Sequence, residues 1–257
     1  GHNFKYNPGG LPAELGNSQT HILSLNHVLS PTTFYELRVN RFFTEYQRYV
    51  HEDPLATPKY LAHILADTAE GLEDYYLDIS NPEDASQFEL IKGERQYEWI
   101  IDPDSPLGYV HSDSNAAPSA YSFFKTGQEM EHFKRNTSYW VGKLDFTSQI
   151  HKNHQLKTGA ELRLYELELH SFTIRPAVDE NGQEIKPFQP SIPDISSYYR
   201  NDYIKEPTEI SAYIQDKIEL KEMNINIGLR FDYFDANSVV LTDPEDPNIY
   251  DPILVVN

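Results

Sequence analysis

The sequence predicts an all-β protein: a six-stranded antiparallel meander that forms part of a transmembrane β-barrel with long extracellular loops. First, several stretches alternate between apolar and polar residues; Ile225, Ile227 and Leu229 share one face of residues 225–234, as expected of a strand. Second, these stretches come in pairs joined by very short turns. Third, long loops separate the pairs, and short turns at one rim with long loops at the other are typical of outer-membrane barrels.

The first predicted hairpin joins a strand at 18–29 to a strand at 34–50. In the second strand, Leu37 and Val39 share one face with Arg41, which interrupts the apolar row. A long cationic side chain can reach water from the edge of a bilayer, so we expect Arg41 to mark the membrane rim.

The second predicted hairpin joins strands at 137–150 and 154–173. Its two faces again separate apolar from polar residues as far as Tyr165, after which the apolar positions change parity to Leu167 and Leu169. A β-bulge would produce such a change, and so would a strand that leaves the bilayer.

The third predicted hairpin joins strands at 208–220 and 223–235. Asp216 occupies the otherwise apolar face, a position that a place near the periplasmic rim would make tolerable. The three turns, at 30–33, 151–154 and 221–224, are expected on one rim. The residues expected to face lipid are Leu37, Val39, Leu144, Phe146, Leu162, Leu164, Ile227, Leu229 and Phe231, and those expected to face the lumen are Arg38, Lys143, Glu161, Arg163, Arg230 and Asp232.

The remaining segments, 51–136, 174–207 and 236–257, are predicted long loops. Residues 51–136 carry 17 acids and 6 bases, a net charge of −11 out of the −19 of the whole chain. A connection of this length requires local structure, and we expect a helical turn near 60–66 and a hairpin within 88–101.

Composition narrows the class of protein further. The chain has 18 Tyr, no Cys, and no apolar run long enough for a membrane helix. The acidic balance argues against nucleic acid, which requires a basic surface. Because no signal peptide is visible, we expect an internal fragment of a longer, exported protein.

The hairpins resemble a known family. Residues 209–220, which contain Tyr213-Ile-Gln-Asp216, and the strand Gly228-Leu-Arg-Phe-Asp232 are similar to the barrel signature of TonB-dependent outer-membrane receptors. His154-Gln-Leu-Lys-Thr-Gly-Ala-Glu161 and Leu29-Ser-Pro-Thr-Thr-Phe-Tyr35 resemble a return strand and a periplasmic turn of the same family. These motifs lie in the strands, which make up about half the chain, while the loops match nothing that we can name.

The resemblance implies a barrel of about 22 strands, closed by an N-terminal plug, in the bacterial outer membrane. Such a receptor binds a scarce extracellular ligand and imports it with energy supplied by TonB. The expected partners are therefore outer-membrane lipid, a small ligand, glycan or peptide, and TonB, which would contact N-terminal parts that this chain lacks.

Candidate chemistry is sparse, and we predict no catalytic, cofactor-binding or metal-binding residues. His151 and His154 lie in a turn, and the acidic segments 102–105 and 243–246 could offer oxygen ligands to Ca²⁺ but lack a calcium-loop pattern. No nucleophile motif occurs, so we expect no enzyme. On the lumen face, Arg230 and Asp232 are expected to pair with each other.

Aromatic side chains in the loops are the candidate ligand contacts. They could stack on a carbohydrate or siderophore, or pack the loops against each other, which we favour. These residues are Tyr75, Tyr76, Trp99, Tyr121, Phe123, Phe124, Tyr198 and Tyr199.

Two other classes of protein remain open. A secreted, carbohydrate-binding β-sandwich would also use half-apolar strands and loop aromatics, but its turns would be of similar length at both ends. A barrel enzyme of the outer membrane would need a nucleophile and a base at its extracellular rim, and neither is visible.

Overall fold

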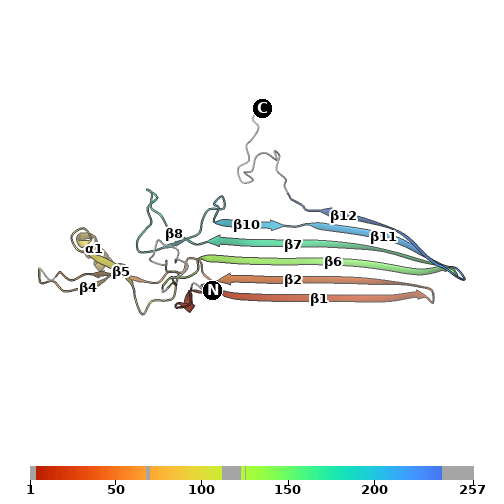
Figure 1. The fold of residues 1–257 in the computed structure, drawn as a ribbon, viewed down its shortest axis with the longest axis horizontal. Helices are drawn as coiled ribbons and strands as arrows, with labels where there is room; N and C mark the ends of the chain where they lie inside the picture. The colour runs from red at the N-terminus through yellow and green to blue at the C-terminus, as the bar shows by residue number, and fades with distance from the viewer. Residues whose placement is uncertain (1–3, 68–69, 112–122, 125, 239–257) are drawn as a thin grey trace, which may run out of the picture. The chain divides into compact units, whose positions relative to one another are not determined.

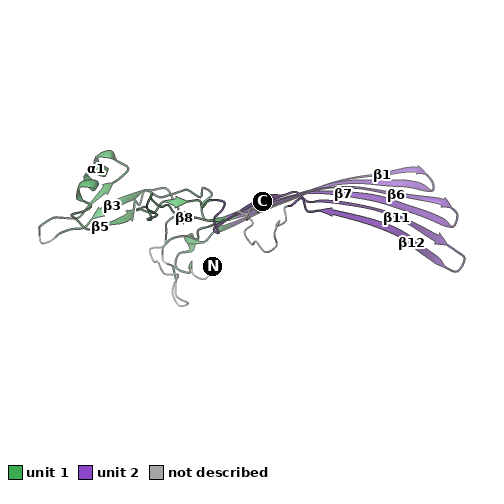
Figure 2. Ribbon diagram, turned by 90° about the horizontal axis from the view of Figure 1, so that it is seen from above, with its two compact units in different colours: residues 1–13, 48–132, 172–194 green, residues 14–47, 133–171, 195–257 purple. Residues whose placement is uncertain are grey.

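The computed structural model describes residues 4–67, 70–111, 123–124 and 126–238. The chain divides into two compact units. Unit 1 comprises Gly1–Ala13, Arg48–His132 and Phe172–Asp194, and unit 2 comprises Glu14–Gln47, Phe133–Ser171 and Ile195–Asn257 (Figure 2). Most of the extended sheet lies in unit 2, whereas much of the two long connections lies in unit 1.

The extended sheet is a meander in which six long strands follow one another in chain order. Its short turns lie together at one end (Figure 1). The strands are β1 (Ala13–Ser30), β2 (Thr33–Tyr49), β6 (Glu131–His151), β7 (His154–Thr173), β11 (Thr208–Glu219) and β12 (Asn224–Asp235). The predicted strand order and the single rim of short turns are therefore confirmed.

A seventh strand of this sheet was not predicted. β10 (Arg200–Lys205) pairs with β7 beyond the start of β11, and Glu206 and Pro207 separate it from β11. The loop expected at 174–207 is thus shorter than predicted, because its last residues continue the sheet.

The register of β7, β11 and β12 confirms two chemically distinct faces. Ala212 pairs with Ala160 on one side and with Phe231 on the other, and Ile214 pairs with Thr158 and Leu229. Because directly paired residues project from the same face of a sheet, these apolar side chains form one surface. The intervening positions give a polar surface, in which Tyr213 pairs with Gly159 and Arg230.

Unit 1 contains a small three-stranded antiparallel sheet with β3 (Tyr60–Ile64) between β4 (Tyr75–Asp78) and β5 (Tyr97–Ile101). The helix α1 (Pro82–Ile91) lies between β4 and β5 in the chain. The expected helical turn near 60–66 is therefore wrong, because residues 60–64 form the central strand of this sheet. The expected hairpin within 88–101 is also wrong, because residues 82–91 are helical and β5 pairs with β3.

Two apolar clusters hold unit 1 together. Ala62, Ile64, Leu77 and Phe88 pack between the small sheet and α1. The second cluster joins Tyr109 to Ile174 and Phe188, so the two long connections of the chain share a core. All buried hydrophobic side chains among the described residues belong to unit 1.

Short elements complete unit 1. The 3-10 helix η2 (Pro8–Gly10) lies near the start of the chain, and β8 (Arg175–Pro176) pairs with β9 (Pro190–Ser191). Most of the loop predicted at 236–257 lies outside the described residues, which end at Ser238.

Candidate functional site

The apolar face of the unit 2 sheet is the more exposed of its two faces. Along residues 160–166 of β7, Leu162 and Leu164 are exposed, whereas the alternating Glu161 and Arg163 are half-buried. On β11, Ile214 is 50% exposed between the half-buried Tyr213 and Gln215. A sheet with one face in a protein core and one in water has the opposite pattern, because its apolar residues are covered. The apolar face of unit 2 therefore requires a surrounding that is itself apolar.

The polar face carries a cavity of about 350 Å³ on β7, β11 and β12. Its charged groups pair with one another. Arg163 Nε donates to Glu161 Oε1 at 2.6 Å, and an Arg163 Nη lies 3.8 Å from Glu209. Arg230 Nε donates to both carboxylate oxygens of Asp232 at 2.9 Å, as predicted for a wall pair. The cavity thus offers a polar wall in which each charged group has an oppositely charged partner, with Arg163 shared by Glu161 and Glu209.

A glycine on this polar face accommodates an aromatic ring. A Cβ at Gly159 would lie 2.5 Å from the Tyr213 ring and 2.7 Å from Asp145 Oδ1. The Tyr213 hydroxyl donates to Asp145 Oδ1 at 2.7 Å. The Tyr213 side chain on β11 therefore passes over Gly159 on β7 and reaches Asp145 on β6, so it joins three adjacent strands.

Asp216, the carboxylate on the otherwise apolar face, has a partner on the next strand. His154 Nδ1 lies 2.7 Å from Asp216 Oδ2, and both side chains are on the apolar face near the short turns. A cross-strand hydrogen bond reduces the cost of a carboxylate on such a face. This pair could not be predicted from the sequence, because the two residues are 62 positions apart.

Among the predicted ligand contacts, Tyr75 and Trp99 pack against the apolar cluster of the small sheet. The Arg95 guanidinium lies 5.4 Å from the Tyr75 ring centroid, and Phe88 lies 5.2 Å from Trp99. These contacts favour a packing role for both residues. Tyr76 differs, since its side chain is 54% exposed.

The other predicted aromatic contacts lie elsewhere. The Phe123 ring contacts Tyr6 edge-on, and Phe124 packs against Phe4 in the same unit. Tyr198 and Tyr199 belong to unit 2, where Tyr198 is almost fully exposed. Tyr121 lies outside the described residues. The described members of the set do not gather into one site within either unit.

Sequence reasoning missed a histidine held between two carboxylates. His63 Nδ1 lies 3.0 Å from Glu98 and Nε2 lies 3.2 Å from Asp74, while the ring stacks on Tyr76 at 4.5 Å. The hydrogen bonds that the His63 ring makes to the carboxylates of Glu98 and Asp74 raise its pKa above 6.5. A neutral imidazole would turn a lone pair toward one carboxylate, so this geometry fits the imidazolium. In the sequence, His63 alternates with the apolar residues Ala62 and Ile64, a pattern that would place it on the polar face of a strand.

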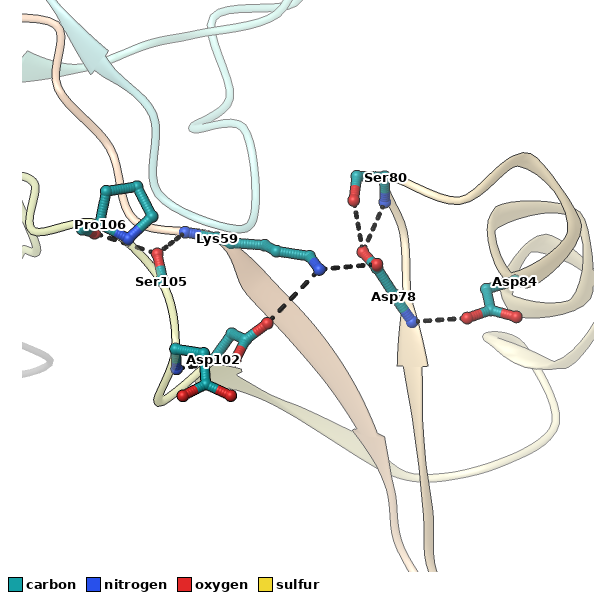
Figure 3. A network of polar contacts seen from close by, with 8 residues as sticks. Lys59, Asp78, Ser80, Asp84, Asp102, Ser105 and Pro106 are labelled. Atoms are coloured by element: carbon teal, nitrogen blue, oxygen red, sulfur yellow. Dashed lines mark hydrogen bonds and ion pairs between the residues drawn. The ribbon is translucent and has the colours of Figure 1, made fainter.

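A second charged cluster fixes the ends of the small sheet (Figure 3). Lys59 Nζ lies 2.8 Å from Asp78 and 3.4 Å from Asp102. The Lys59 ammonium and Ser80 hold the pKa of Asp78 below its usual range. Asp102 also accepts the backbone N–H of Asp104 at 3.0 Å. In the proposed calcium segment at 102–105, the first carboxylate is therefore paired with a lysine, which disfavours a cation there.

Metal binding gains no support elsewhere. The rings of His151 and His154 lie 6.0 Å apart, and His154 is engaged by Asp216. The part of the chain that the structure describes contains no group of three or more His, Cys, Asp or Glu side chains placed to hold a metal ion. The acidic segment 243–246 lies outside the described residues.

Comparison with protein-family models, with curated proteins and with solved structures found no significant match for this chain. Among the described residues, no helix is both long and apolar enough to cross a membrane. The features that bear on function are therefore the two faces of unit 2 and the folded connections of unit 1.

Proposed function

We propose that this chain is part of a TonB-dependent outer-membrane receptor, with unit 2 contributing to its transmembrane β-barrel. The receptor binds a scarce extracellular ligand and imports it with energy delivered by TonB. In this proposal the chain has no enzymatic activity and holds no cofactor, and its surroundings are the lipids of the bacterial outer membrane.

The inverted burial pattern of unit 2 carries the proposal. Its alternating strands expose apolar residues such as Leu162 and Ile214, while charged residues such as Glu161 on the other face are half-buried. Unit 2 has no buried hydrophobic side chain among its described residues. Lipid chains would cover this face without a second protein layer, as they do in a membrane barrel. A secreted β-sandwich, the alternative, would cover it with a second sheet, and the described residues of unit 2 form no such layer.

The edges of the sheet support a larger barrel. β1 and β12 each pair with one neighbour only among the described strands, and their side chains are exposed along almost their whole length. Long unpaired edges promote aggregation unless further strands cover them. Bacterial single-chain barrels have at least about eight strands, so six would not close one. The figure of about 22 strands rests on the family resemblance alone.

The folded connections support a ligand-binding role for unit 1. A rigid scaffold commonly carries its binding residues on loops, and these loops have their own sheet, helix and apolar cores. The net charge of −11 in 51–136 disfavours an anionic ligand and suits a neutral glycan, a peptide or a cationic chelate.

Cysteine labelling of whole cells tests the topology. Single cysteines at Asn181, in a long connection, and at Lys152, in a short turn, would be treated with a membrane-impermeant maleimide. We expect labelling at Asn181 in intact cells, and labelling at Lys152 only after the outer membrane is opened. Recovery of the protein in a soluble fraction, or the reverse labelling, would overturn the proposal.

A deletion tests the binding role. Asp102 N donates to Lys59 O at 3.0 Å, so residues 60–101 can be replaced by a short Gly-Ser link without separating the chain ends. This variant keeps Tyr109 and its contact with Ile174. We expect normal barrel assembly with lost ligand uptake, and unchanged uptake would assign binding elsewhere.

A further inference from the structure

We infer that two rows of polar side chains on the apolar face of unit 2 lie at the two head-group layers of a phospholipid-containing bilayer, eight residues apart along the strands. This inference rests on the proposed membrane function and adds the depth at which the sheet sits. The short-turn row is marked by Asp216 with His154, and the opposite row by Arg41 with Trp140.

The short-turn row is polar on four strands. Asp216 on β11 bonds to His154 on β7, and Thr33 Oγ1 on β2 lies 2.8 Å from Ser148 Oγ on β6. All four side chains belong to the parity of the apolar face. A hydroxyl pair and a carboxylate–histidine pair at one level suit the hydrated head-group layer rather than hydrocarbon, because each retains partners in water or phosphate.

The opposite row begins with Arg41 and Trp140. The Arg41 guanidinium lies 5.5 Å from the Trp140 ring centroid. Trp is enriched where bilayer meets water, and an arginine there can bind lipid phosphate while its stem stays in apolar surroundings. On β11 and β12 this level carries Thr208, which pairs with Asp235.

The levels on separate strands agree. Contacts join Asn136 to Glu168 and Tyr139 to Tyr165, so one further step along both strands sets Trp140 opposite Leu164. Leu164 in turn pairs with Thr208. The row marked by Arg41 therefore continues across the sheet.

The band between the rows is uniform. Thr33–Arg41, Trp140–Ser148, Thr208–Asp216 and Ile227–Asp235 each span nine residues. The three outward positions inside each span carry no charge, as with Ile210, Ala212 and Ile214 on β11.

The height of this band matches a barrel in a membrane. Eight steps of about 3.3 Å give about 26 Å along a strand, and a tilt of about 40° reduces this to about 20 Å of depth. An apolar band is about 25 Å tall, so each row lies within about 3 Å of the edge of such a band.

Site-directed spin labelling tests these depths, and the chain offers a clean background because it contains no Cys. Single cysteines at Ala212, Ile218 and Asp235 would be labelled in the full-length protein, reconstituted in bilayers of phosphatidylethanolamine and phosphatidylglycerol. Ser211, on the polar face beside Ala212, is the matched control. Accessibility to oxygen, which concentrates in hydrocarbon, would be compared with accessibility to a water-soluble nickel chelate.

We expect oxygen to dominate at Ala212, and the nickel chelate to dominate at Ile218 and Asp235. The label at Ser211 should lack the hydrocarbon signature. If Ile218 or Asp235 is as deep as Ala212, the assigned boundaries are wrong although the protein is in the membrane. If Ala212 shows no hydrocarbon signature at all, the membrane function itself fails, which is a different result.

Discussion

Replacing Gly159 by alanine should disrupt the contact that joins β6, β7 and β11. The new Cβ would lie 2.5 Å from Tyr213 Cε1, 2.7 Å from Asp145 Oδ1 and 2.9 Å from the Leu144 carbonyl oxygen. Real Cβ atoms do not approach other atoms this closely, so the Tyr213 ring must move. Moving the ring separates its hydroxyl from Asp145, to which it donates at 2.7 Å.

The expected loss follows from these two effects. Overpacking costs about 1–3 kcal/mol. A hydrogen bond to a charged acceptor is worth about 1.5–3 kcal/mol, and we take the lower end because Tyr213 and Asp145 are only half-buried. Removing a glycine from a strand returns about 0.5–1 kcal/mol. Gly159→Ala should therefore lower the free energy of unfolding by about 2–4 kcal/mol, the sum of these effects.

Urea unfolding of the full-length protein in lipid vesicles, followed by the gel mobility of the folded form, measures this loss. Gly142→Ala is the matched control, because a Cβ there meets nothing within 4 Å. In a Tyr213→Ala background the cost of Gly159→Ala should fall, since the ring that clashes and its hydrogen bond are gone and only the contacts with Asp145 and the Leu144 carbonyl remain. Equal effects of Gly159→Ala and Gly142→Ala, or no coupling to Tyr213, would refute this account of the contact.

Three further predictions concern the two faces and unit 1. In the proposed membrane barrel, Leu229→Arg should cost about 2–4 kcal/mol of stability and Arg230→Leu much less, and the opposite ranking in the same urea assay would mean that the faces are reversed. The raised pKa of His63 implies a contribution to stability that is full below pH 6.5 and lost as the pH rises through the folded-state pKa; NMR titration of the ring, together with the pH dependence of His63→Gln unfolding, checks the sign. Lys59→Met should raise the pKa of Asp78 toward 3.8, measured by carboxyl NMR, and an unchanged pKa would remove Lys59 as its cause.

The strands of the long sheet could be predicted because each carries its own signal. The face of a strand residue depends on its parity, and a bilayer or a core selects one parity over many positions. β7, expected at 154–173, has those bounds, and β11 and β12 end within one residue of the expected positions. Two strands joined by a very short turn can pair with each other only in antiparallel orientation.

The small sheet of unit 1 could not be predicted in the same way. Residues 60–64 contain Leu61 and Ala62, which suit a helix, and five residues are too few for a clear period. Their strand exists because β4 and β5 pair with them from either side. By contrast, α1 had a readable start in Asn81, whose side chain accepts from Glu83 N, followed by a proline. That capping signal was overlooked.

In the candidate site, too, contacts within one strand could be predicted, whereas contacts between distant segments could not. The pairing of Arg230 with Asp232 was predictable, because residues two apart on a strand share a face. The clamp around His63 was not, since Asp74 and Glu98 reach it from a loop and from another strand. The aromatic residues of the loops signalled an apolar core as much as a binding surface, and Trp99 shows the core role.

The apolar positions on β7 change parity close to the inferred membrane boundary. Leu164 is exposed and pairs with Thr208, the last residue of the band on that side. Leu167 and Leu169, three and five residues further on, are on the other parity, and both are half-buried. Opposite this change, Glu206 and Pro207 interrupt the partner strand, and Tyr165 N donates to Pro207 O at 3.0 Å. Outward leucines therefore end at the level where lipid would end, and a strand that passes from lipid into water has no further reason to keep apolar side chains on its outer face.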